Sequence, residues 1–142
     1  MHPVITDDLK TLVPRCVSQL QQLGGATVLL TGANGMIAAY VVDAIVAANA
    51  SILAANPARV IAVTHRPVAP ADRLGHLLNR SDVIFLTADV GQPFIIPDGV
   101  THIIHAASWA DPQRYLAHPI EVMDANVMGA RHLLQYAADH AA

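Results

Sequence analysis

Two glycines and an alanine stand at the spacing of a turn that holds phosphate. The segment from Thr31 to Ala38 reads T-G-A-N-G-M-I-A and lies between a continuous apolar run and a helical pattern. Gly32 permits the tight turn off a strand, and Gly35 lets backbone N–H groups approach a pyrophosphate at the positive end of the helix. Ala38 fills the small position where helix and strand pack closely. This predicts a dinucleotide site, and a glycine loop that only reverses the chain is the alternative.

Other chemistries fit the sequence less well. A P-loop needs Gly-Lys-Ser/Thr, and no lysine follows Gly35. Ser108 lacks the glycine-flanked elbow that exposes a hydrolase nucleophile. His102 and His105 are three positions apart on an expected strand and should point to opposite faces, and Cys16 is the only cysteine. No metal site is therefore predicted.

The elements that must position the turn alternate between apolar strands and helices. Four nearly apolar runs predict strands at residues 26–31, 59–64, 83–88 and 101–107. Helical patterns cover residues 4–23, 37–55, 72–78 and 112 onward. The first is one helix or a pair, with a possible break at Pro14. In the last, Pro119 restarts a long helix that runs to about residue 138. Asp111 is the expected N-cap of that last region. The fold class predicted is α/β, a Rossmann-type parallel sheet with helices on both faces, truncated after about four strands.

Composition excludes several partners. Hydrophobic residues make up 54% of the chain and charged residues 13%, with a net charge of −3 and no run of Lys or Arg. A nucleic-acid partner is therefore not expected. The most apolar stretch, 37–56, is interrupted by Asp43, Asn49 and Ser51 and is too polar for a membrane span. With one cysteine and no secretory pattern at the N-terminus, a cytoplasmic location is expected.

The glycine turn resembles the TGxxGxxG hallmark of the extended short-chain dehydrogenase/reductases, the NAD-dependent epimerase/dehydratase family that acts on nucleotide sugars, with alanine in place of the last glycine. Three further motifs of that family follow in its order: Asp89-Val90, Ile104-His105-Ala106-Ala107-Ser108, and Asn126-Val127-Met128-Gly129. The stretch 106–112, with Tyr115 and Pro119, is most similar to the UDP-glucuronate decarboxylase branch. The resemblance covers residues 27–138.

The resemblance implies roles for particular residues. The backbone from Gly32 to Ile37 would carry the pyrophosphate, Asp89 and Val90 would contact adenine, and 106–108 would line the nicotinamide side. The candidate cofactor-binding residues are Gly32, Asn34, Gly35, Met36, Ile37, His65, Arg66, Asp89, Val90, Ala106, Ala107, Ser108 and Asn126. Two of them have plainer interpretations, because Asp89 could cap the next turn and Asn126 could face solvent from its helix.

The residues after the second strand bear on the choice of cofactor. The chain has Thr64-His65-Arg66 there and no carboxylate to bind the ribose hydroxyls of NAD. A cation could instead meet the 2′-phosphate of NADP, so NADP is slightly favoured over NAD. Arg66 as a solvated loop residue is the alternative.

The family's catalytic residues are expected to lie outside this chain. Its Tyr-x-x-x-Lys pair cannot be formed, because the tyrosines are Tyr40, Tyr115 and Tyr136 and the only lysine is Lys10. The resemblance therefore implies the NAD(P)-binding part of a nucleotide-sugar epimerase, dehydratase or decarboxylase that works by hydride transfer. We expect a piece of a longer enzyme, and a non-catalytic NADP-binding sensor or scaffold is the alternative.

The expected organisation is a helical extension at residues 1–25 and an incomplete NAD(P)-binding domain at 26–142. The fourth strand should be an apolar edge that self-association or strand exchange covers. A stripe on the last helix predicts either core packing or the helix bundle of a homodimer, and its residues are Ile120, Met123, Val127, Leu134 and Ala137.

Overall fold

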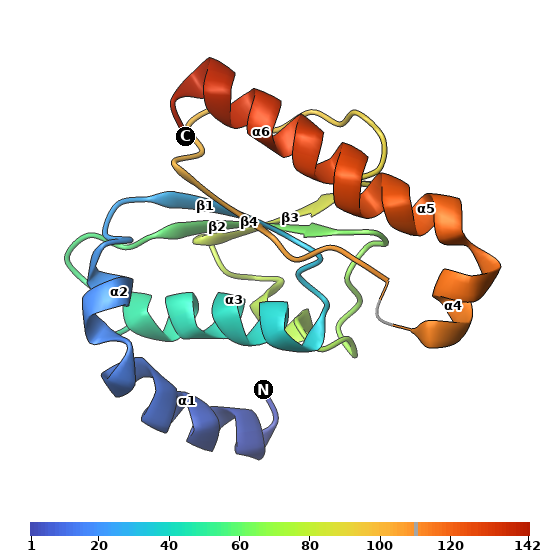
Figure 1. Cartoon of the computed structure of the whole chain (residues 1–142). Coiled ribbons are helices and arrows are strands. Elements are labelled where there is room, and N and C mark those ends of the chain that lie inside the picture. Colours follow the sequence, from blue (N-terminus) through green and yellow to red (C-terminus); the bar gives the residue numbers. More distant parts are fainter. Residues whose placement is uncertain (110) are drawn as a thin grey trace.

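The computed structural model describes residues 1–109 and 111–142, and its centre is a four-stranded parallel sheet (Figure 1). The strands are β1 (Thr27–Thr31), β2 (Arg59–Thr64), β3 (Val83–Thr87) and β4 (His102–His105), in the order β3-β2-β1-β4. Leu29 of β1 lies opposite Ile61 of β2 and Ile103 of β4. The predicted α/β fold with a parallel sheet is confirmed.

The helices cover both faces of this sheet. They are α1 (Pro3–Arg15), α2 (Val17–Gln21), α3 (Met36–Asn49), the 3₁₀ turn η1 (Gly75–Leu77), α4 (Pro112–Ala117), α5 (Pro119–Met123), the π-helical segment η2 (Asp124–Met128) and α6 (Gly129–His140). Figure 1 shows α3 on one face with α1 outside it, and α5 and α6 on the other face. None of the described helices is long and apolar enough to cross a membrane.

Two apolar cores lie on the two sides of the sheet, because side chains alternate between its faces along each strand. Val28 and Leu30 of β1 pack with α3, whereas Leu29 packs on the opposite side with Leu133 of α6. All three β1 side chains are fully buried. This two-sided burial explains why the two inner strands, β1 and β2, are largely apolar, whereas β4 at one edge reads H-I-I-H and is partly exposed.

Several predicted boundaries were wrong for local reasons. The first region is a pair of helices as expected, but the break falls at Cys16 and Pro14 lies inside α1. The helix α3 ends at Asn49 and not near residue 55, and residues 50–55 form turns. The expected helix at 72–78 is a single 3₁₀ turn. The strand β4 ends at His105 because the next two N–H groups bond to the Thr31 hydroxyl instead of continuing the strand.

Asp111 caps the last helical region as predicted. Its Oδ1 accepts a hydrogen bond of 3.0 Å from the backbone N–H of Gln113, at the start of α4. A second helix then begins at Pro119, also as predicted. The continuous path to His140 includes the π-helical segment η2, which the sequence did not indicate.

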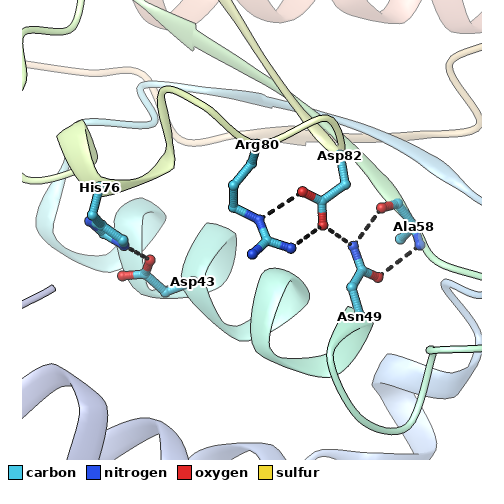
Figure 2. Close-up of polar contacts among 6 residues, drawn as sticks. All are labelled: Asp43, Asn49, Ala58, His76, Arg80 and Asp82. Carbon is cyan, nitrogen blue, oxygen red and sulfur yellow. Dashed lines mark hydrogen bonds and ion pairs between the residues drawn. The ribbon is translucent and has the colours of Figure 1, made fainter.

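The buried side-chain amide of Asn49, drawn in Figure 2, connects the end of α3 to the residue before β2. Asn49 donates to the Ala58 carbonyl over 2.7 Å and accepts from the Ala58 N–H over 2.9 Å, so its amide pairs both backbone groups of that residue. It also donates to Asp82 Oδ2 over 2.8 Å. Arg80 donates two hydrogen bonds to the two oxygens of Asp82. These bonds lower the pKa of the Asp82 carboxyl, and the hydrogen bond from Asn49 lowers it further by a smaller amount.

A second polar cluster joins the middle of α3 to the loop between β2 and β3. Asp43 is fully buried, and its Oδ1 lies 2.8 Å from Nε2 of His76. Figure 2 draws this contact. Its other oxygen is 2.6 Å from Nη2 of Arg73, an ion pair whose angles fall outside hydrogen-bond geometry. Arg73 also stands over the Tyr40 ring, 5.2 Å from its centroid. These contacts hold residues 73–76 against the helix.

Candidate functional site

The turn after β1 requires a glycine at residue 32 for two independent reasons. Gly32 has φ of +67°, a left-handed conformation that residues with a side chain adopt at a cost. A Cβ there would also lie 2.6 Å from Cα of Ala107 and 2.7 Å from the Ala106 carbonyl oxygen. The turn thus brings the segment after β1 into direct contact with the segment after β4.

The first turn of α3 has free backbone donors. Gly35 is its N-cap, with φ of −62° and ψ of 151°, and no side chain caps this end. The Gly35 N–H bonds back to the Gly32 carbonyl over 2.8 Å, but the N–H groups of Met36 and Ile37 have no partner within the helix. Met36 and Ile37 are 78% and 75% exposed. The helix therefore presents its positive end where an anion can reach it.

Asn34 carries an unsatisfied acceptor in the same turn. Its Oδ1 is buried and finds no hydrogen-bond partner among the residues that the structure describes. An unpaired buried polar atom costs free energy, so its presence in a native turn needs an explanation. A bound group that donates a hydrogen bond to Oδ1 would supply one.

A pocket opens beside this turn at the carboxyl ends of the strands. It is lined by Gly32, Val63, Thr64, His65, Ala88, Asp89, Val90, Gly91, Gln92, Ala107, Ser108, Trp109, Glu121, Asp124 and Ala125. Six predicted cofactor-binding residues are brought together here: Gly32, His65, Asp89, Val90, Ala107 and Ser108. The others lie outside its lining, and they are Asn34, Gly35, Met36, Ile37, Arg66, Ala106 and Asn126.

Asp89 has the plainer role that the sequence left open, and it also lines the pocket. Its Oδ1 accepts from the Gly91 N–H over 3.0 Å and its carbonyl accepts from the Gln92 N–H, so it caps the turn after β3. Val90 is buried in the core on the α6 side. Asn126 is exposed on η2, which agrees with its interpretation as a solvent-facing residue of its helix. The turn 89–91 is therefore a fixed wall of the pocket.

Arg66, expected as a free cation, is held by a carboxylate that the sequence analysis missed. Its two terminal nitrogens bond to the two oxygens of Asp72 over 2.8 and 3.0 Å. The Arg66 hydrogen bond and then the Ala69 backbone N–H lower the pKa of Asp72, and Asp72 raises the pKa of Arg66. A 2′-phosphate at Arg66 would have to compete with Asp72. The slight preference for NADP is thus not supported.

Three carboxylates give the pocket an acidic lining. Glu121 of α5 and Asp124 of η2 join Asp89 in its lining. The Glu121 backbone N–H and the His118 ring lower the pKa of Glu121, so its carboxylate is charged near neutral pH. Gly91 separates the other two, because a Cβ on it would lie 3.2 Å from Asp124 Cβ and 3.3 Å from Asp89 Oδ1. No signal in the sequence placed Glu121 or Asp124 at the site.

A partly buried chain of hydrogen bonds connects the pocket walls. Thr31, fully buried at the end of β1, has its hydroxyl 2.7 Å from Nδ1 of His105. The same hydroxyl accepts from the N–H groups of Ala106 and Ala107 over 3.2 and 3.3 Å. Nε2 of His105 lies 3.1 Å from the Ala125 carbonyl oxygen of η2. No cluster of three or more His, Cys, Asp or Glu side chains suited to a metal ion occurs within the described part of the chain.

The chain is similar to one family and to several solved structures. The sequence profile described as "NAD dependent epimerase/dehydratase family" matches residues 28–142. A double mutant of the dTDP-glucose 4,6-dehydratase DesIV from Streptomyces venezuelae, crystallised with NAD and DAU bound, is 24% identical, with a TM-score of 0.61 over 80% of this chain and 36% of that one. Pen from Bacillus thuringiensis is 14% identical, with a TM-score of 0.57 over 81% of this chain and 34% of that one.

These matches carry different weight. At identities of 24% and 14%, the solved structures show the shared fold alone. This chain spans about a third of their length, 36% and 34%. No curated protein matches it.

Proposed function

Because the chain belongs to the NAD dependent epimerase/dehydratase family, we propose that residues 26–142 hold the nicotinamide dinucleotide of an enzyme that converts a nucleotide-linked sugar. One observation carries this proposal: the left-handed Gly32 turn leads into an α3 helix whose first N–H groups are uncapped, beside a pocket at the carboxyl ends of parallel strands. In open α/β sheets this is where dinucleotides bind.

The residues present fit such a cofactor. The backbone N–H groups from Gly32 to Ile37 would hold the pyrophosphate, and a ribose hydroxyl of the cofactor would donate to Asn34 Oδ1, which lacks a donor. Asp89 and Val90 would border the adenine, and Ala106, Ala107 and Ser108 the nicotinamide side. A nicotinamide held there would supply hydride-transfer chemistry for a sugar substrate. The described residues position the cofactor and supply no Tyr-x-x-x-Lys pair.

The substrate class and the reaction are part of the same proposal. Family membership supports a nucleotide sugar as the substrate of the whole enzyme, and the similar fold of a dTDP-glucose 4,6-dehydratase agrees with it. Epimerase, dehydratase and decarboxylase chemistry share the hydride step, so this part of the protein serves any of them. Residues 1–25 form a helical extension whose α1 packs on α3. The single cysteine fits a reducing compartment such as the cytoplasm.

The first test is titration of the protein with NAD⁺ and NADP⁺ by calorimetry. We expect wild-type protein to prefer NAD⁺, because Asp72 occupies both terminal nitrogens of Arg66. Asp72→Asn should free the guanidinium and strengthen NADP⁺ binding about tenfold while NAD⁺ binding changes little. If neither NAD⁺ nor NADP⁺ binds, the proposed function is wrong.

A matched control exists elsewhere in the chain. Arg80 and Asp82 also form a two-bond fork, through Nε and Nη2 of Arg80 over 2.7 and 2.8 Å, and neither residue lines the pocket. Asp82→Asn should leave the ratio of NADP⁺ to NAD⁺ affinity unchanged. An equal change of that ratio in both variants would show that the Asp72 effect is not local.

We also propose a homodimer through the stripe on α5, η2 and α6. Its side chains Ile120, Met123, Val127 and Leu134 are 65%, 60%, 57% and 70% exposed. An exposed apolar stripe of this kind is typical of a helix that packs on a partner. Of the two interpretations that the sequence allowed, core packing does not describe these four residues.

The dimer proposal predicts a result in sedimentation equilibrium. Wild-type protein should sediment as a dimer at micromolar concentration, and Leu134→Glu should sediment as a monomer with an unchanged circular dichroism spectrum, because it places a charge in the apolar contact. Gln135→Glu adds a charge at the next, exposed position and should stay dimeric. A monomeric wild type would overturn the dimer and leave the dinucleotide site unaffected.

A further inference from the structure

His105 stands where three segments of the pocket meet. Its ring reaches Thr31, next to the Gly32 turn, and Ala125, in the pocket lining on η2. Gly129 makes room for the ring, because a Cβ there would lie 3.2 and 3.3 Å from its Cε1 and Nε2 atoms. The ring thus spans from the end of the sheet to the helical wall.

The partners of His105 fix which ring nitrogen carries the proton. The Ala125 carbonyl can only accept, so Nε2 must donate to it. In a neutral ring Nδ1 is then an acceptor, and the Thr31 hydroxyl donates to it while accepting from the N–H groups of Ala106 and Ala107. Every polar atom of this chain of bonds is satisfied with the Nε2–H tautomer.

The same hydrogen bond accounts for the π-helical segment. In a regular α-helix the Gly129 N–H would donate to the Ala125 carbonyl, four residues earlier. Here it donates to the Asp124 carbonyl instead, which is the π pattern. The Ala125 carbonyl is thereby released, and His105 takes the place of the missing backbone donor. A histidine side chain thus completes the bonding of a helix defect.

This defect determines which residues face the pocket. One residue corresponds to about 100° of rotation in an α-helix. If η2 became regular, the chain up to and including its first residue, Asp124, would rotate by about that angle relative to α6, and Glu121 would rotate with it. Both residues line the pocket in the observed arrangement. Their placement therefore depends on the π-helical segment.

We propose that His105, in its Nε2–H tautomer, is a positioning residue that holds η2 in π geometry and so sets the helical wall of the dinucleotide pocket against the Gly32 turn. The predicted effect of His105 on NAD⁺ binding rests on the proposed function. His105 itself is absent from the pocket lining and acts through its contacts with Thr31 and with Ala125 of η2.

The first experiment reads the geometry directly, without ligand. Nitrogen-15 spectra of the wild-type ring should show the Nε2–H tautomer at neutral pH, and the backbone shifts of residues 124–129 should depart from regular α-helix values. In His105→Leu those backbone shifts should move to regular helix values, because the Gly129 N–H returns to the Ala125 carbonyl. A proton on Nδ1 in the wild type, or an unchanged π-helical segment in the variant, would overturn the proposal.

The second experiment measures NAD⁺ binding in a graded series. His105→Gln can still place an N–H near the Ala125 carbonyl, so we expect its Kd within about threefold of the wild type. His105→Asn can replace only the Nδ1 acceptor, and His105→Leu replaces neither group, so both should bind about tenfold more weakly because the pocket wall is misplaced. Equal affinities of the Gln and Asn variants would contradict the role assigned to Nε2.

A control separates positioning from general loss of stability. Asn49→Ala removes buried hydrogen bonds at the far end of α3 and should lower stability without changing the NAD⁺ Kd of the folded protein. If Asn49→Ala weakens binding as much as His105→Leu does, the His105 effect is one of stability and the proposal fails. A wild type that does not bind NAD⁺ contradicts the proposed function, whereas the tautomer and the shifts of 124–129 still test the geometry.

Discussion

Gly32→Ala is expected to lower the free energy of unfolding by several kcal/mol and to remove measurable dinucleotide binding. The left-handed φ of +67° costs a residue with a Cβ about 1–2 kcal/mol. The new Cβ would also lie 2.6 Å from Cα of Ala107, backbone that cannot turn away like a side chain, which adds about 1–3 kcal/mol. Urea unfolding gives the stability and titration with NAD⁺ gives the binding.

Gly99→Ala is the matched control for backbone conformation alone. Gly99 has φ of +82°, but a Cβ on it would meet nothing within 4 Å among the described residues. This variant should lose about 1–2 kcal/mol and bind NAD⁺ like the wild type. Equal losses in the two variants would show that the contact between the Gly32 turn and the segment after β4 is looser than the structure has it.

Asn49→Ala should be the most destabilising change away from the pocket, with a loss of about 3 kcal/mol in urea unfolding. The change deletes three hydrogen bonds, two to the backbone of Ala58 and one to Asp82, as Figure 2 shows. Asn49 and Ala58 are both buried, so the N–H and carbonyl of Ala58 would lose their side-chain partner with little access to water.

An exposed amide provides the comparison. Gln135 also donates to a carboxylate, Asp139, but does so at the surface of α6, and Gln135→Ala should cost less than about 0.5 kcal/mol. If Asn49→Ala lowered the free energy of unfolding as little as Gln135→Ala does, the Ala58 backbone groups would have other hydrogen-bond partners. The proposed role of Asn49 in connecting α3 to β2 would then be wrong.

The sheet could be predicted because its signal is local. β1, β2 and β3 each contain a continuous apolar run, and the predicted second strand, 59–64, coincides with β2. The end of α3 could not be predicted in this way. Its pattern of apolar residues continues past Asn49, and the chain leaves the helix where that side chain finds Ala58, a contact nine residues ahead that no periodicity reports.

The candidate site was predictable to the same extent. The glycine turn follows from residue types in a strand-turn-helix setting, and Gly32 adopts the conformation expected of it. The pairing of Arg66 with Asp72 depends on the fold of an intervening loop, so the sequence suggested a free cation where the structure has a neutralised one. Glu121 and Asp124 reach the pocket through a π-helical segment stabilised by a histidine about twenty positions earlier, which leaves no local pattern.

The position of β1 in the sheet has a consequence for how the protein emerges from the ribosome. One edge of β1 pairs with β2, which follows within about thirty residues, whereas its other edge waits for β4, and the hydrogen bond from Thr27 to Thr101 spans 74 residues. During synthesis that second edge stays unpaired until β4 has left the exit tunnel. The Gly32 turn meets Ala107 only at that moment, so the pocket beside the turn forms late in synthesis.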